Sequence, residues 1–172
     1  MDTTRPARRL RIFLRDFRML EATASLAEGQ SLATYFAHRK SYVNLRAAQW
    51  TGTGDDVKHA VLRIDQVLWA AALDDDIPLT NASAAGTPRP VEMQLDGGLL
   101  LRGKLILGEQ QRLSDYLEIA GEFVPVLEAS LLRSGRPPQK VNVNLGGVMV
   151  NQAAIQAVWE VDAQRTAGTS GA

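Results

Sequence analysis

The sequence predicts a mainly β protein made of two tandem small five-stranded β-barrel-like repeats, each with one short inserted helix. Two observations predict this fold. Segments that alternate apolar and polar residues, the pattern of a half-buried strand, recur along both halves of the chain. In addition, a shift of 81 positions places Leu14 on Leu95 and Leu20 on Leu101, and the match continues without a gap. This period exceeds that of a solenoid unit, so we interpret it as the duplication of a small domain.

The second repeat is expected to begin with a β-hairpin. Residues 91–95 alternate apolar and polar side chains, which predicts the first strand. The segment Asp96-Gly97-Gly98 predicts a tight turn, because glycine adopts positive φ without steric cost. Residues 99–107 then form the return strand, in which Leu100 and Ile106 lie on the face away from the core.

A helix and three more strands are expected to complete this repeat. Residues 112–120 place apolar side chains at helical spacing, and residues 123–132 have the composition of a strand. Residues 141–145 alternate again, and the glycine pair 146–147 is expected to turn the chain. Residues 148–161 would then close the repeat.

The first repeat follows the same plan with weaker turn signals. We expect strands at residues 10–15 and 20–26, a helix at 31–39, a strand at 42–50 and a closing segment at 57–72. Five curved strands with polar outer faces can close as a small barrel, which removes exposed sheet edges.

The composition of the segments predicts five regions. The linker is rich in Asp, Ala, Ser, Gly and Pro. Beyond the third strand the repeats align with five additional residues of offset, which places Trp69 on Ile155. The regions are a basic N-terminal arm (1–9), the first repeat (10–73), the linker (74–90), the second repeat (91–161) and a disordered tail (162–172).

Composition restricts the classes of function. The 19 basic and 19 acidic residues give zero net charge, which disfavours nucleic acid as the partner, since phosphate neutralisation supplies most of that affinity. The absence of cysteine excludes disulfides and thiolate metal sites, and we expect neither a metal nor a cofactor. No apolar run is long enough for a membrane helix, and the N-terminus lacks the layout of a signal peptide. We therefore expect a cytoplasmic protein and leave peripheral attachment to the inner membrane open.

Residues 91–105, with a strand, an Asp-Gly turn and a Leu-x-Gly-x-Leu strand, resemble the first two strands of Sm-like proteins. Residues 150–158 resemble the last strands of that family, in which a short turn precedes an Ile-x-x-Val pattern. The resemblance implies a small bent barrel, ring assembly and an RNA site. The helix expected after the second strand departs from the family, whose helix lies at the N-terminus. We therefore carry over the fold and no functional residue.

No catalytic motif is evident. The sequence contains no G-x-S-x-G, Walker or G-x-G-x-x-G pattern, and we expect neither an enzyme nor a small-molecule site. His38 is expected to complement the C-terminus of the first helix. The run Asp74-Asp75-Asp76 is interpreted as solvated acids, although hard cations also prefer such oxygens. An enzyme that relies on chemistry supplied by its substrate is left as a third class.

Surplus apolar and basic residues predict a binding function. Six arginines and two aspartates give the N-terminal segment a charge of about +4, suited to an acidic protein surface, anionic lipid or RNA. Large apolar side chains on the outer face of a barrel need cover, either from the sister repeat or from another protein. The candidate partner-binding residues are Arg5, Arg8, Arg9, Phe13, Phe17, Leu100 and Ile106.

We therefore predict a non-enzymatic scaffold subunit. It would either dock on a larger protein assembly, for example at the cytoplasmic face of a membrane complex, or form a homo-oligomer. The alternative is an Sm-like RNA-binding protein that uses Lys58, His59 and the arginine arm on phosphates.

Overall fold

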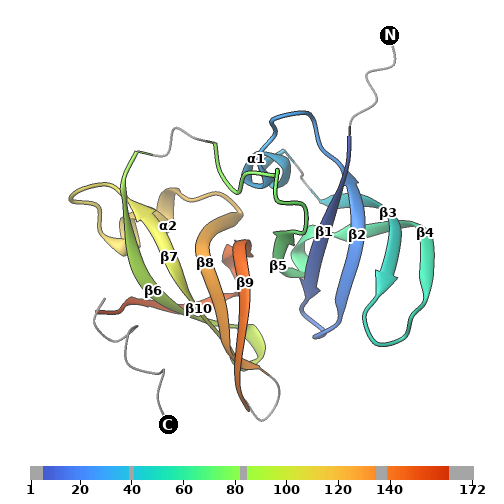
Figure 1. The fold of residues 1–172 in the computed structure, drawn as a ribbon. Helices are drawn as coiled ribbons and strands as arrows, with labels where there is room; N and C mark the ends of the chain where they lie inside the picture. Colours follow the sequence, from blue (N-terminus) through green and yellow to red (C-terminus); the bar gives the residue numbers. More distant parts are fainter. Residues whose placement is uncertain (1–5, 39–40, 82–84, 135–138, 163–172) are drawn as a thin grey trace.

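The computed structural model describes residues 6–38, 41–81, 85–134 and 139–162 (Figure 1). These residues form ten β-strands, two short α-helices and three 3-10 turns, which confirms the expected mainly β class. All strand pairs are antiparallel, and the strands form one open sheet in the order β10-β6-β7-β8-β9-β5-β1-β2-β3-β4. Arg5 and residues 163–172 of the expected tail lie outside the described residues.

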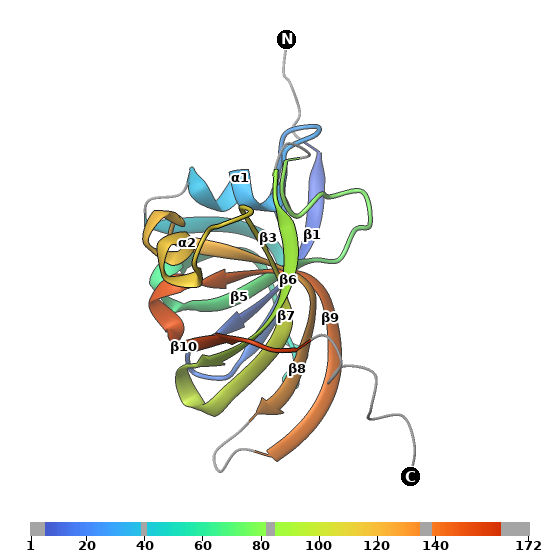
Figure 2. The same cartoon turned by 90° about the vertical axis from the view of Figure 1, so that its left-hand side faces the viewer.

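The elements of the two halves follow each other in the same order. The first half contains β1 (Ala7–Leu14), β2 (Met19–Ser25), α1 (Leu32–Ala37), β3 (Tyr42–Trp50), β4 (Asp56–Arg63), the turn η1 (Ile64–Gln66) and β5 (Val67–Ala72). The second half contains β6 (Thr87–Leu95), η2 (Asp96–Gly98), β7 (Leu99–Leu107), α2 (Leu113–Ile119), β8 (Phe123–Ser134), β9 (Gln139–Asn151), η3 (Gln152–Ala154) and β10 (Ile155–Glu160). In Figure 2 the strands are strongly curved and both helices lie toward the same side of the molecule.

Local chemistry explains where the helices and the hairpin turn form. Ser31 caps α1, because its hydroxyl accepts a hydrogen bond from the backbone N–H of Thr34 at 3.1 Å. Gly97 adopts a φ of 74°, as the turn between β6 and β7 requires. The expected helices and the expected hairpin turn therefore form at the positions that the sequence predicts.

A single strand pair joins the two halves into one sheet. β5 of the first half pairs with β9 of the second half, with Trp69 opposite Val150 and Ala71 opposite Val148. Figure 1 shows this junction in the middle of the molecule. The junction makes the sheet continuous, a property that alternation within each half does not reveal.

Each hydrophobic core contains residues from both halves of the chain. On β5, Val67 and Ala70 belong to the first core, whereas Leu68, Trp69 and Ala71 belong to the second. Phe123 and Met149, from the second half, are buried in the first core. The halves are therefore packed into one another as well as paired through their backbones.

Three boundaries differ from those that the sequence predicts. β1 begins at Ala7, inside the expected arm, and the backbone N–H of Arg9 donates to a carboxylate oxygen of Asp74 at 2.8 Å. β6 begins at Thr87, inside the expected linker, because residues 87–90 pair with β7. The strand β9 runs through the glycine pair 146–147, which lies beside a shift of register with β8, and the chain turns later, at η3.

Candidate functional site

The ends of the sheet are two strand edges with apolar side chains. Within the described residues, β4 pairs only with β3, and β10 pairs only with β6. Such edges present backbone N–H and C=O groups to another strand. Val61 on β4 is 64% exposed, and Trp159 on β10 is 40% exposed. These edges are the first candidate docking surface.

Tyr42 lies beside the β4 edge. It is the first residue of β3, it pairs with Arg63 of β4, and 53% of its surface is exposed. Among the described residues, Tyr42 and Val61 are, with Ile119, the three most exposed large hydrophobic residues. Isolated exposed apolar groups are common, but two on one sheet edge form a surface that a partner can cover.

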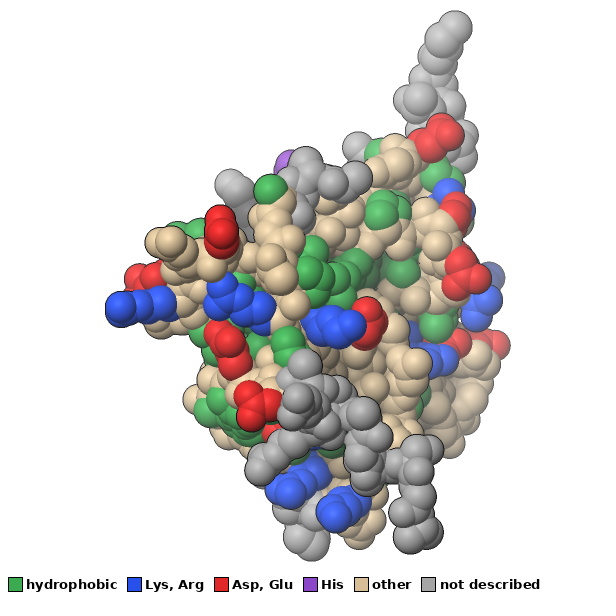
Figure 3. Space-filling view, turned by 60° about the vertical axis from the view of Figure 1, so that its left-hand side comes forward, with side chains coloured by type: hydrophobic (Ala, Val, Ile, Leu, Met, Phe, Trp, Pro, Cys, Tyr) green, Lys and Arg blue, Asp and Glu red, His purple; other side chains and the backbone are tan. Residues whose placement is uncertain are grey.

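The helix α2 lies at the other end of the molecule and has an incompletely covered apolar side. None of its residues, Leu113–Ile119, is buried, whereas α1 buries Leu32, Tyr35 and Phe36. Phe123 contributes to this difference, because its ring packs on Phe36 with ring centroids 4.6 Å apart. On α2, Tyr116 and Leu117 pack on the second core and stay partly exposed. In Figure 3, which brings this part of the molecule forward, hydrophobic side chains are visible between charged ones.

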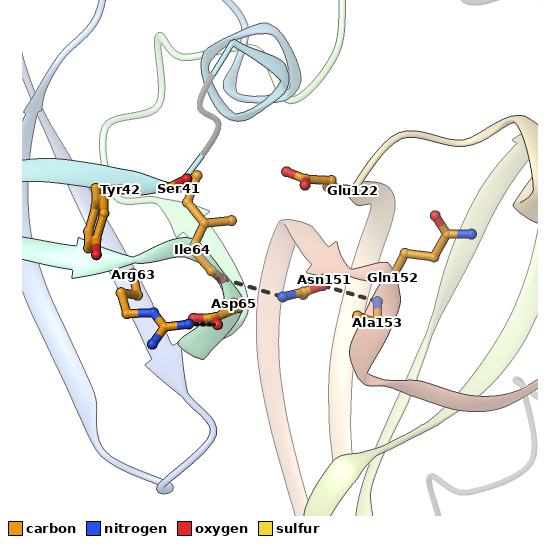
Figure 4. Close-up of a pocket in the computed structure, with 9 residues that line it drawn as sticks. All are labelled: Ser41, Tyr42, Arg63, Ile64, Asp65, Glu122, Asn151, Gln152 and Ala153. Atoms are coloured by element: carbon orange, nitrogen blue, oxygen red, sulfur yellow. Dashed lines mark hydrogen bonds and ion pairs between the residues drawn. The ribbon is translucent and has the colours of Figure 1, made fainter.

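A cavity among the described residues lies where the two halves meet. It has a volume of about 580 Å³ and is lined by residues of both halves (Figure 4). The 3-10 turns η1 and η3 bring its polar side chains together. The lining residues are Ser41, Tyr42, Arg63, Ile64, Asp65, Glu122, Asn151, Gln152 and Ala153.

Several polar side chains of this cavity form hydrogen bonds or ion pairs within the protein. The side-chain amide of Asn151 donates to the carbonyl of Val67 at 2.9 Å, and its oxygen accepts from the N–H of Ala153 at 3.0 Å. Arg63 forms an ion pair with Asp65. Because two carboxylates accompany this one arginine, the cavity does not concentrate positive charge for a phosphate. Among its lining residues, Asn151 links the two halves through its hydrogen bonds to Val67 and Ile64.

The N-terminal arginines have carboxylate neighbours. Arg8 forms an ion pair with Asp76 at 2.8 Å, and Arg9 lies 3.9 Å from a carboxylate oxygen of Glu21. The run Asp74-Asp75-Asp76 therefore lies against β1 and contacts its basic residues. Within the part of the chain that the structure describes, no group of three or more His, Cys, Asp or Glu residues lies close enough to hold a metal ion.

Two of the four expected apolar binding residues, Phe13 and Phe17, lie between the halves. Phe13 stacks on Trp69 with ring centroids 5.4 Å apart, and the edge of Phe17 faces Phe13. Both phenylalanines pack against the second core, so the second half supplies part of the cover that the sequence required. Leu100 is buried and Ile106 is half-buried on β7.

The basic residues of the RNA alternative lie on the β4 edge. Lys58 and His59 are both exposed there, and His59 is paired with Arg46 of β3. His38 follows α1, and its ring Nδ1 lies 2.7 Å from the carbonyl oxygen of Thr34, as expected for a residue that complements a helix C-terminus.

The sequence did not single out Tyr42, Val61 or the apolar side of α2. All three belong to regular alternating or helical patterns, and such patterns do not tell an edge strand from a central one. Among the described residues, no helix has the length and hydrophobicity needed to cross a membrane. Comparisons of the chain with protein-family models, with curated proteins and with solved structures found no match.

Proposed function

We propose that this chain is a tandem duplication of one small five-stranded barrel-like unit and acts as a non-enzymatic protein-binding subunit of a larger assembly. The small bent barrel is also the fold that the resemblance to Sm-like proteins implies. The strand order supports the duplication, because β5-β1-β2-β3-β4 and β10-β6-β7-β8-β9 are the same arrangement.

The pairing registers also support the duplication. Leu10 pairs with Ala22, and Val91 with Gly103, so both partners are shifted by 81 positions. The other residue pairs of the first three strands follow the same shift. The only two non-glycine residues with positive φ inside described strands, Ala47 at 45° and Glu128 at 48°, are also 81 positions apart. An independent origin of the two halves would not place the same backbone irregularity at the same position.

The offset changes at the fourth strand of each unit. Tyr42 pairs with Arg63, and Phe123 pairs with Asn151, so the fourth strands correspond with an offset of 88. The fifth strands keep this offset. Val67 pairs with Leu14 in the first unit, and Ile155 pairs with Leu95 in the second. For the fourth and fifth strands, the offset between the two units in the structure is therefore two positions larger than the offset read from the sequence.

A charge-swapped ion pair occupies corresponding positions in the two units. Arg11 on β1 binds Glu21 on β2, with a distance of 3.0 Å from Nε to Oε1. In the second unit Glu92 stands on β6, and Arg102 on β7 binds it at 2.9 Å. The geometry is kept while the signs are exchanged, as expected if a duplicated cross-strand pair changed both partners.

The observation that carries the binding role is the apolar side chains on two open strand edges. Proteins usually protect an edge with charges, proline or a short strand. Here Val61 and Trp159 are exposed on the two edges, in the case of β4 beside the exposed Lys58 and His59. We propose that protein partners pair with these edges, and that Arg5, Arg8 and Arg9 add contacts to acidic groups, including those at the cytoplasmic face of a membrane complex.

Gentle purification of the tagged protein from its own cells tests this function. We expect a stoichiometric protein complex, recovered from the soluble or the membrane fraction and identified by mass spectrometry. RNA that copurifies at low salt and is lost at high salt would overturn the proposal in favour of the RNA-binding alternative, because phosphate contacts are steeply salt-dependent.

A further inference from the structure

We propose that a second copy of this chain docks head-to-tail, with β4 of one copy paired antiparallel to β10 of the next. The inference rests on the duplication proposed above and names one partner of the proposed binding function. It follows from the way in which the chain already joins its own two units.

The junction inside the chain is heterologous. It joins the fifth strand of the first unit, β5, to the fourth strand of the second unit, β9. The fourth strand of the first unit, β4, and the fifth strand of the second unit, β10, are the corresponding strands that remain at the ends of the sheet (Figure 1). Heterologous contacts of this kind add further copies in the same direction.

The register of the internal junction can be transferred to the open edges. Ala70 lies opposite Met149 at the junction, and the 88-position offset converts this pair into Val158 opposite Val61. The flanking pairs transfer in the same way. They become Ala157 opposite Leu62 and Trp159 opposite Ala60. All six side chains are apolar, so their burial leaves no unpaired charge.

The exposed side chains of the first unit correspond to buried side chains of the second. Phe123 and Met149, which enter the first core, are 7% and 1% exposed. Their counterparts are Tyr42 and Val61, the exposed pair at the β4 edge. We infer that these two side chains enter the second core of a neighbouring copy.

The receiving surface is the half-covered end of the second unit. In the first unit Phe36 of α1 is fully buried because Phe123 packs on it. The counterpart of Phe36 is Leu117 of α2, which remains partly exposed. Tyr42 of a second copy would cover Leu117 as Phe123 covers Phe36, which gives α2 the packing that it lacks.

The hydrogen bonds of the junction can also be reproduced. Asn151 donates to the carbonyls of Val67 and Ile64 across the internal junction, at 2.9 and 3.4 Å. Its counterpart is Arg63, whose guanidinium carries several donors. In the second copy the carbonyls that correspond to these acceptors are those of Ile155 and Gln152. The open edges therefore contain the donor and the acceptors for the same contact.

Sedimentation velocity and light scattering of the full chain over a range of concentrations test the inference. We expect species heavier than the 18.7 kDa monomer, with a population that rises with concentration. The substitutions Val61→Lys and Val158→Glu should each raise the concentration of half-association at least about tenfold, because each buries an unpaired charge. Circular dichroism melting establishes that each variant is folded.

The double variant V61K/V158E tests the register itself. The introduced ammonium and carboxylate would face each other across every junction, so we expect association to recover toward that of the unmodified chain. Val57→Lys is the matched control, because Val57 is exposed on the same strand outside the transferred register. Tyr42→Ser is a second test that leaves both cores intact, and we expect it to weaken association.

Several results would overturn the inference. They are a monomer at every concentration, an equal effect of V57K and V61K, or a double variant that associates no better than the single variants. A monomer that still forms a stoichiometric complex with a different protein would overturn the second copy as partner and leave the proposed binding function standing. Self-association without any such complex would support the inference and count against the larger assembly.

Discussion

The rings of Phe36 and Phe123 lie with centroids 4.6 Å apart, and this contact places a side chain of the second half inside the core of the first. Phe36 belongs to α1 and Phe123 begins β8. Met149 enters the same core from β9. The stability of the first half therefore depends on the presence of the second.

Phe123→Ala is predicted to lower the free energy of unfolding by about 3–4 kcal/mol, because it removes a buried ring and leaves a cavity. Urea unfolding, followed by near-UV and far-UV circular dichroism, measures the loss. We expect a single transition, since the ring couples the two halves. Ile119→Ala is the control, because Ile119 is largely exposed on α2 and its loss should change stability by less than about 0.5 kcal/mol. Unfolding in two separated steps in the unmodified protein would contradict this coupling.

Gly97→Ala is predicted to destabilise the protein by about 2–3 kcal/mol, because two costs add. The backbone has a φ of 74°, and a Cβ atom at this position would collide with the ring of Phe17. Gly52→Ala separates the two costs. Gly52 has a φ of 100° with no atom near the added Cβ, so only the backbone cost of about 1 kcal/mol remains. Equal losses in the two variants, measured by thermal melting, would show that the Phe17 contact contributes nothing.

Tyr116 is predicted to ionise at higher pH than a free tyrosine, because burial raises the pKa of its phenol. The unfolded chain loses this proton first, near pH 10, so the native state holds more protons above that pH. Stability should therefore fall as pH rises above about 10 and level off beyond the raised folded-state pKa. Absorbance titration near 295 nm checks the ionisation, and Tyr116→Phe should remove the late component. A titration that is unchanged by this substitution would refute the assignment.

Reversal of charge at Arg5, Arg8 and Arg9 to glutamate is predicted to weaken capture of the partner and to reduce its salt dependence, because the acidic contacts are lost. Copurification yield at several salt concentrations measures the effect. Arg133→Glu is the control, an exposed arginine on β8 and far from the arm in sequence. The ion pair of Arg8 with Asp76 is at the surface, so its loss should cost at most about 1 kcal/mol of stability. Unchanged yield in the triple variant would show that the arm does not contribute to binding of the partner.

Alternation and turn residues were sufficient to predict most local structure. Gly97 and Gly98 mark the hairpin turn because only glycine adopts such φ values easily, and Ser31 marks the start of α1. The chain turn expected at Gly146-Gly147 was wrong, since Gly146, with a φ of 70°, lies inside a continuous strand beside a register shift. A glycine pair permits either a turn or a bulge, and the pairing partner decides between them.

The junction and the candidate docking surface could not be predicted in the same way. Met149 is apolar and alternates correctly whichever core it enters, so its sequence position does not reveal that it crosses to the first half. Val61 shares its strand face with His59 and Arg63, so alternation predicts its exposure but gives no sign that a partner covers it. The type of a residue indicates whether its side chain is suited to burial, but not which segment of the chain buries it.

The exchange of side chains between the cores has a consequence for biosynthesis. Ribosomes deliver the chain from its N-terminus, so β1 to β5 emerge well before Phe123 and Met149. During that interval the inner side of α1 lacks its cover, and the unpaired side of β5 lacks β9. Until those residues have emerged, the nascent first half therefore exposes apolar surface and a strand edge that are covered in the complete protein.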